Sequence, residues 1–147
     1  MIKRKKIKKI IKKKSANENE LKEKIKKITE DLYYMSETDA EILPFVGNKV
    51  ETITDEEILK ANKSPAETPV EKRDFDGFFD NLTKMQDWFG EKEKATAEKF
   101  AELKELLESN LKCLKVYKIG KIQLDIYVVG LDSENNIVGI KTKAVET

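Results

Sequence analysis

Residues 114–145, LKVYKIGKIQLDIYVVGLDSENNIVGIKTKAV, decide the fold class. Apolar and polar residues alternate through the middle of this stretch, which is the two-residue period of a β-strand. Gly120-Lys121 and Asp132–Asn136 interrupt the alternation with residues that favour turns. The stretch therefore predicts three consecutive antiparallel strands, at about 114–119, 122–129 and 137–145.

The segments before this meander have the period of helices. Apolar residues recur every three or four positions from about Asn17 to Tyr34 and again from about Glu91 to Lys112. An antiparallel sheet backed by such helices is an α+β layered domain. Shorter segments complete the expected order: a strand at 44–50, a helix begun by the capping-box pair Thr54 and Glu57, a helix at 74–82, and loops at 35–43 and 62–72.

The composition limits which functions are open to the chain. Its 147 residues include no histidine, which is the commonest acid–base residue and metal ligand. The six glycines form no phosphate-binding loop. The one cysteine, Cys113, lies between Leu111 and Leu114 and is expected to be a buried structural thiol, which favours a reducing compartment. We therefore predict that the protein is not an enzyme and has no metal site or cofactor of its own.

Charge divides the chain into two parts. Residues 1–14 hold nine of the 29 basic residues and no acid, which leaves 20 basic against 28 acidic residues, a net charge of −8, in the remainder. We expect a flexible basic arm at 1–16 and a folded domain at 17–147. The acidic body should repel nucleic acid and attract basic proteins. The arm could be a solvated tail, or it could contact a membrane surface or nucleic acid. No secretion signal is visible, so we expect a cytoplasmic protein.

Two polar stretches contain residues that could contact a partner. One is Tyr34-Met35-Ser36-Glu37 and the other is Gln86-Asp87-Trp88-Phe89. Taken alone, Glu37 is ordinarily a solvated loop acid and Trp88 is ordinarily an anchor in the core. Residue type and spacing do not choose between these interpretations and a binding role.

These stretches, with others in the same order, resemble the nuclease A inhibitor family, whose members inhibit sugar-non-specific nucleases. The match runs from about Glu20 to Thr147, with Met85 in place of a proline. It is poor between Phe45 and Arg73, so no contact is carried over there, and the basic arm has no counterpart. The matching segments are Leu32–Glu37, Gln86–Phe89, Glu108–Lys112, Leu124–Gly130 and Gly139–Thr147.

The resemblance implies an α–β–α sandwich with a mainly antiparallel sheet, similar to that of plant pathogenesis-related proteins. It also implies an inhibitor of a Mg-dependent nuclease of the ββα-metal, or His-finger, type, acting as a monomer in a one-to-one complex. In the family pattern, Glu37 and Thr147 would be ligands to the magnesium ion that the nuclease supplies. Gln86 and Trp88 would make further contacts with the enzyme.

This mechanism makes chemical sense. Mg²⁺ takes oxygen ligands at about 2.0–2.1 Å and usually keeps several waters, so carboxylates that replace those waters imitate the scissile phosphate. Two alternatives stay open. One is an interaction module of the same fold with an unrelated protein partner. The other is a surface-binding protein whose basic arm is the functional part.

Overall fold

The computed structural model describes residues 20–146 of the chain. A helix over residues 20–29 comes first and is called the N-terminal helix below. The elements that follow are β1 (Tyr33–Met35), β2 (Asp39–Glu41), β3 (Leu43–Lys49), α2 (Asp55–Ala61), β4 (Val70–Arg73), α3 (Phe75–Thr83), α4 (Glu91–Asn110), β5 (Lys112–Gly120), β6 (Gln123–Leu131) and β7 (Asn136–Val145).

Five of the strands form one sheet in the order β3-β7-β6-β5-β4, and every neighbouring pair is antiparallel. The predicted meander is β5, β6 and β7, which fill the centre of this sheet. Its register aligns Tyr117 with Tyr127, and Tyr127 with Lys141. Strands β1 and β2 form a separate antiparallel hairpin. The prediction of an antiparallel meander is confirmed.

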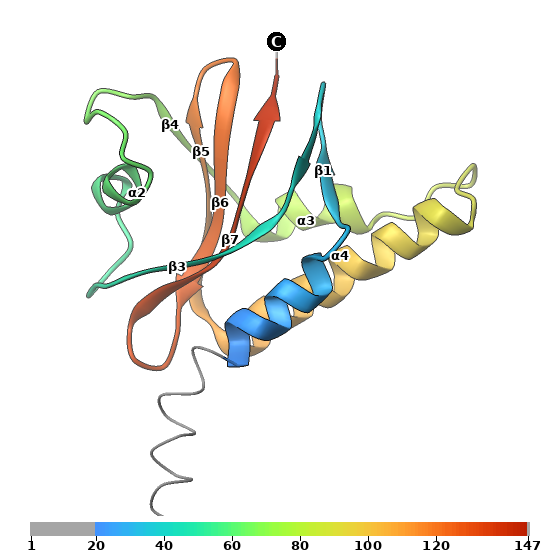
Figure 1. Ribbon diagram of the computed structural model, residues 1–147, viewed down its shortest axis with the longest axis horizontal. Helices are drawn as coiled ribbons and strands as arrows, with labels where there is room; N and C mark the ends of the chain where they lie inside the picture. The colour runs from blue at the N-terminus through green and yellow to red at the C-terminus, as the bar shows by residue number, and fades with distance from the viewer. Residues whose placement is uncertain (1–19, 147) are drawn as a thin grey trace, which may run out of the picture.

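Helices cover both faces of the large sheet. Alternate residues of β6 enter two different apolar clusters: Ile126 and Val128 pack in one with residues of the N-terminal helix, α3 and α4, whereas Tyr127 and Val129 pack in the other with residues of α2. Figure 1 shows these three layers, with α2 on the far side of the sheet from α3 and α4. The α+β class is confirmed, and the layering explains why residues at both phases of the β6 alternation are buried.

Two helices begin where their capping residues predict. The Thr54 hydroxyl accepts a hydrogen bond from the Glu57 amide at 3.2 Å and caps α2. The Asp74 carboxylate accepts one from the Gly77 amide at 2.9 Å and caps α3. A side-chain oxygen that binds one of the unpaired amides of a first helical turn fixes the helix start.

The first helix ends earlier than predicted, and this changes the elements that follow it. It stops at residue 29 rather than near Tyr34, because Asp31 adopts a left-handed φ of 60° that reverses the chain. Residues 33–41, which were expected to finish a helix and enter a loop, instead form β1, a turn and β2. The prediction of a loop at 35–43 is therefore wrong.

Two further local predictions are wrong. Strand β4 lies at the end of the expected 62–72 loop, where Val70–Arg73 pairs with Val116–Ile119 of β5. Cys113 is exposed rather than buried. It has a left-handed φ of 56° at the irregularity where β5 shifts register between Lys112 and Lys115. Burial was predicted from its apolar neighbours Leu111 and Leu114, but such a bulge interrupts the inward and outward alternation of side chains in the strand.

The basic arm at 1–16 lies outside the described residues, as does the predicted start of the first helix near Asn17. Within the part of the chain that is described, none of the helices has the length and apolar character needed to cross a membrane.

Tyr117 makes a test of the second apolar cluster possible. It is fully buried, and its hydroxyl has no hydrogen-bond partner within residues 20–146. Burial, and secondarily the Asp55 carboxylate, raises the pKa of Tyr117 from 10.0 to about 12. Because the pKa is higher in the folded state, the contribution of Tyr117 to stability is complete below pH 10 and is lost as the pH rises through about 12.

Tyr117→Phe should therefore change the free energy of unfolding at neutral pH by less than about 1 kcal/mol, because no paired hydroxyl is lost. It should also flatten the fall of that free energy between pH 10 and about 12. Urea denaturation across a pH series measures both effects, with Tyr33→Phe, at an exposed tyrosine, as the control. An alkaline slope equal to that of the wild type would contradict the assignment.

Candidate functional site

The β1–β2 hairpin docks on β7 through three hydrogen bonds. The Thr142 hydroxyl donates to the Glu41 carbonyl at 2.8 Å, and the Val145 amide donates to the Ser36 hydroxyl at 3.0 Å. The Glu37 amide donates to the Val145 carbonyl at 3.2 Å. Figure 1 shows the turn of this hairpin beside the C-terminal end of β7, at the top of the molecule. The turn and the strand end therefore form one local structure, which we call the turn–terminus site (residues 36–38 and 145–146).

Ser36 and Thr38 close the turn around Glu37. Both the amide and the hydroxyl of Ser36 donate to the Thr38 carbonyl, at 3.1 and 3.0 Å. Glu37 lies between them and is exposed. The backbone on both sides of Glu37 is thus fixed while its side chain is accessible, as a contact residue requires.

The last described residue of the chain is also held in place. The Glu146 amide donates to the Ile122 carbonyl at 2.9 Å, and the Glu146 carboxylate pairs with the Lys118 ammonium at 3.0 Å. The Lys118 side chain is only 11% exposed, so solvent screens this ion pair less than a pair on the open surface. The strand end is therefore anchored to both β5 and the β5–β6 turn.

Tyr34 borders the same region. Its ring stacks on that of Phe78 in α3, with centroids 5.6 Å apart and planes inclined by 6°. Burial first, and then the negative charge of Glu146, raises the pKa of Tyr34, while Arg73 acts in the opposite direction. The phenol is therefore neutral near physiological pH. An open pocket beside the site is lined by Tyr34, Phe78, Lys118 and Glu146 among others.

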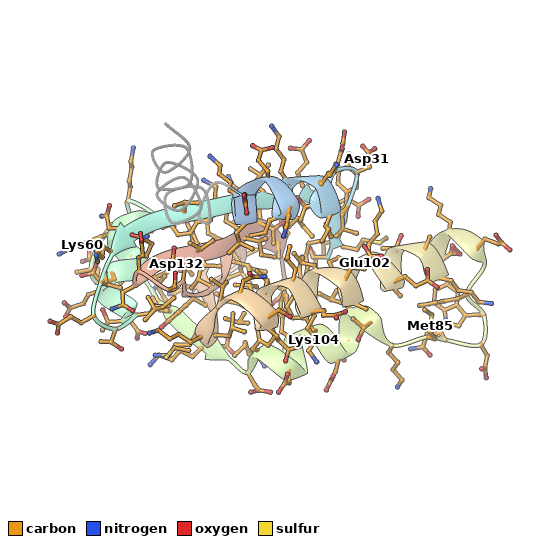
Figure 2. All side chains as sticks on the ribbon, turned by 90° about the horizontal axis from the view of Figure 1, so that it is seen from below. Asp31, Lys60, Met85, Glu102, Lys104 and Asp132 are labelled. Carbon is orange, nitrogen blue, oxygen red and sulfur yellow. The ribbon has the colours of Figure 1, made fainter. Side chains whose placement is uncertain are left out.

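The second predicted contact region lies on the loop between α3 and α4. Trp88 is 73% exposed, and its ring meets Phe89 edge to face with centroids 4.7 Å apart. Gln86 is half-buried and accepts a backbone hydrogen bond from Phe89 at 3.1 Å. The interpretation of Trp88 as a core anchor is wrong, because this loop extends from the body at the N-terminal end of α4. Figure 2 shows Met85, in the same loop, at the tip of the molecule beyond Glu102.

The structure brings some of the predicted residues together and keeps others apart. Glu37 is hydrogen-bonded to Val145, at the end of β7. Thr147, two residues after Val145, lies outside the described residues. The loop between α3 and α4, which contains Gln86 and Trp88, is a separate protrusion at the right of Figure 1. Within residues 20–146, no group of three or more His, Cys, Asp or Glu side chains could hold a metal ion. Glu37 therefore adds oxygen donors to the site, but the described residues do not assemble a ligand set around it.

Sequence reasoning missed two residues of the turn–terminus site, Ser36 and Glu146, and also Lys118, which pairs with Glu146. The strand register aligns Lys118 with Ile126 and Ile126 with Thr142, and from there the Lys118 side chain reaches Glu146. No local pattern carries that information. Ser36 had a weak signal, since a serine in a polar turn often binds nearby backbone groups.

The fold and these exposed groups define a small three-layer domain that presents an acidic turn and a protruding aromatic loop. The family model of nuclease A inhibitor-like proteins matches residues 19–147. The chain belongs to this family, so the resemblance is confirmed, and membership implies an inhibitor whose partner is a nuclease protein. Comparison with curated proteins finds no match.

Trp88→Ala tests whether this ring belongs to the surface. Because the side chain is largely exposed, the substitution should change the free energy of unfolding by no more than about 0.5 kcal/mol. Phe79→Ala is the matched comparison, because Phe79 is a fully buried aromatic residue, and it should cost about 3–5 kcal/mol. Urea denaturation measures both. A decrease in the free energy of unfolding above about 2 kcal/mol for Trp88→Ala would indicate that the ring is part of the core.

Proposed function

We propose that the protein inhibits a Mg-dependent, sugar-non-specific nuclease of the His-finger type by occupying its active site. In this proposal Glu37 and Thr147 are ligands to the magnesium ion of the nuclease, and Gln86 and Trp88 contact the enzyme nearby. The observation that carries the proposal is the pair of hydrogen bonds that joins residues 36 and 37 to Val145.

Chain length turns this observation into a limit on distance. Thr147 follows Val145 by two residues, and two residues of chain reach at most about 7 Å. Glu37 is bonded to Val145 through its own backbone. Glu37 and Val145, two residues before Thr147, are therefore adjacent, as a metal ion shared by Glu37 and Thr147 requires.

The donor chemistry fits magnesium. Mg²⁺ prefers hard oxygen ligands and is usually held by only one or two carboxylates, with water in the other positions. A nuclease uses those water positions for the scissile phosphate and the attacking water. Anionic oxygens from the inhibitor that take these positions would exclude the substrate without any reaction.

The charge of the body supports the same partner. Outside residues 1–14 the chain has a net charge of −8. A nuclease cleft that binds phosphates is positively charged, so opposite charges would accelerate encounter and hold the inhibitor in register. The same charge disfavours direct binding of nucleic acid by the folded domain.

Trp88 supplies a second point of attachment. An exposed tryptophan is unusual on a protein surface and common at the energetic centre of an interface. Its loop is separate from the turn–terminus site, so one partner would have to span both regions. A typical protein–protein interface covers about 800 Å² on each partner, which is sufficient for two such regions.

Removing the charge of Glu37 tests the metal bridge. Glu37→Gln should weaken inhibition of a purified His-finger nuclease by about 2 kcal/mol or more, roughly thirtyfold in the inhibition constant, because a charged interface partner is lost. Glu134→Gln is the matched control, since Glu134 is an exposed acid in the turn between β6 and β7, at the opposite end of the strand. Titration at fixed magnesium concentration gives both constants.

The same titration distinguishes the alternatives. Stoichiometric loss of activity with the wild type supports the inhibitor, whereas no loss favours an interaction module with another partner. A protein lacking residues 1–14 should inhibit as well as the full chain, and its failure would favour the basic arm as the functional part. An unchanged constant for Glu37→Gln would remove Glu37 from the proposed site.

Extending the chain past Thr147 tests the second ligand. A short glycine-serine extension would convert the terminal carboxylate into a neutral amide and crowd the ion, so inhibition should weaken by at least about tenfold. The same extension before Met1 is the control for added length. Equal inhibition by the two extended proteins argues against Thr147 as a ligand.

A further inference from the structure

We propose that Ser36 is a positioning residue that fastens the Glu37 turn to the end of β7 before any partner arrives. Its hydroxyl would hold Glu37 at a fixed separation from Val145, two residues before the second proposed magnesium ligand. The inference rests on the proposed function, since a fixed separation matters only if both groups reach one ion.

The hydrogen bonds of Ser36 run in two directions. Its hydroxyl donates to the Thr38 carbonyl inside the turn at 3.0 Å and accepts from the Val145 amide of β7 at 3.0 Å. A hydroxyl has one donor and two acceptor positions, so a single oxygen serves both structures. Ser36 is half-buried, which reduces competition from water for these bonds.

Both backbone groups of Val145 form hydrogen bonds with the Glu37 turn. Its amide binds the Ser36 hydroxyl, and its carbonyl accepts from the Glu37 amide at 3.2 Å. Loss of the Ser36 hydroxyl would remove one of these two hydrogen bonds between the turn and Val145. The turn would then be held less firmly on the strand end.

The strand end on the other side of this link is already rigid. Glu146 is held by the Ile122 carbonyl and by the largely buried Lys118 ammonium. Ser36 therefore joins the Glu37 turn to an anchored strand end. Fixing Glu37 relative to Val145 in advance removes an ordering cost that binding would otherwise have to overcome.

The first experiment compares three single variants in the nuclease titration. Ser36→Ala should raise the inhibition constant by about three- to tenfold, as expected for loss of the hydrogen bond to the Val145 amide, mainly through faster dissociation. Ser36→Thr, which keeps the hydroxyl, should restore inhibition to near the wild-type level. Ser133→Ala is the matched control, because Ser133 is an exposed serine in the turn between β6 and β7, at the opposite end of β7. Wild-type inhibition by Ser36→Ala would overturn the proposal.

A double-mutant cycle separates positioning from general loosening. If Ser36 acts through Glu37, Ser36→Ala should have almost no further effect in a Glu37→Gln background. The same loss in both backgrounds would overturn the positioning role. If Glu37→Gln weakens inhibition and Ser36→Ala does not, the positioning role of Ser36 is refuted and the metal-ligand assignment stands. If Glu37→Gln inhibits as well as the wild type, the metal-ligand assignment and the positioning role are both refuted.

Amide hydrogen exchange tests the link without any nuclease. In the isolated protein, Ser36→Ala should accelerate exchange of the Val145 amide severalfold, whereas Ser133→Ala should not. Unchanged exchange of amides in the middle of α4 would show that the fold is intact. Equal protection of Val145 in the wild type and in Ser36→Ala would overturn the proposal.

Discussion

The outer edge of β7 has to be paired along its whole length, and β3 pairs only part of it. The first residue of β3, Leu43, lies opposite Lys141, so the edge from Thr142 to Val145 continues past the partner strand. Backbone amides and carbonyls at a sheet edge need other partners. The β1–β2 hairpin supplies them at Val145, through residues 36 and 37. Nearer the start of this edge, the Glu41 carbonyl accepts a hydrogen bond from the Thr142 hydroxyl.

The pairing of this edge places Glu37 at the end of β7. The chain folds back after Glu41 to become β3, so the hairpin has no freedom to dock elsewhere on β7. Its turn must meet the strand end, and Glu37 occupies that turn. The pairing of this sheet edge therefore creates the turn–terminus site. To that geometry the metal-bridging proposal adds only the chemistry of one carboxylate and Thr147.

The same residues show how far sequence reasoning reaches. The β6 alternation and the Thr54 cap predicted their elements because each signal is contained in a few neighbouring residues. Strands β1 and β2 have three residues each, too few to show a period, and Tyr34 extended the helical pattern although it belongs to a strand and stacks on Phe78. Glu37 and Trp88 were identified through resemblance to a family. Ser36 and the Lys118–Glu146 pair depend on strand register, which no local pattern reveals.

The separation of the two contact regions bears on specificity. A metal bridge alone discriminates poorly, because many nucleases hold a magnesium ion that carboxylates can reach. Trp88 lies on a loop whose position is set by α4, a helix whose residues Phe100 and Leu107 are buried against the body. The distance between the loop and the turn–terminus site is therefore fixed by a rigid element rather than by a flexible linker. In the proposed complex, a partner would have to match that spacing as well as offer an ion, and a mismatch at either region would lose the binding energy of the other.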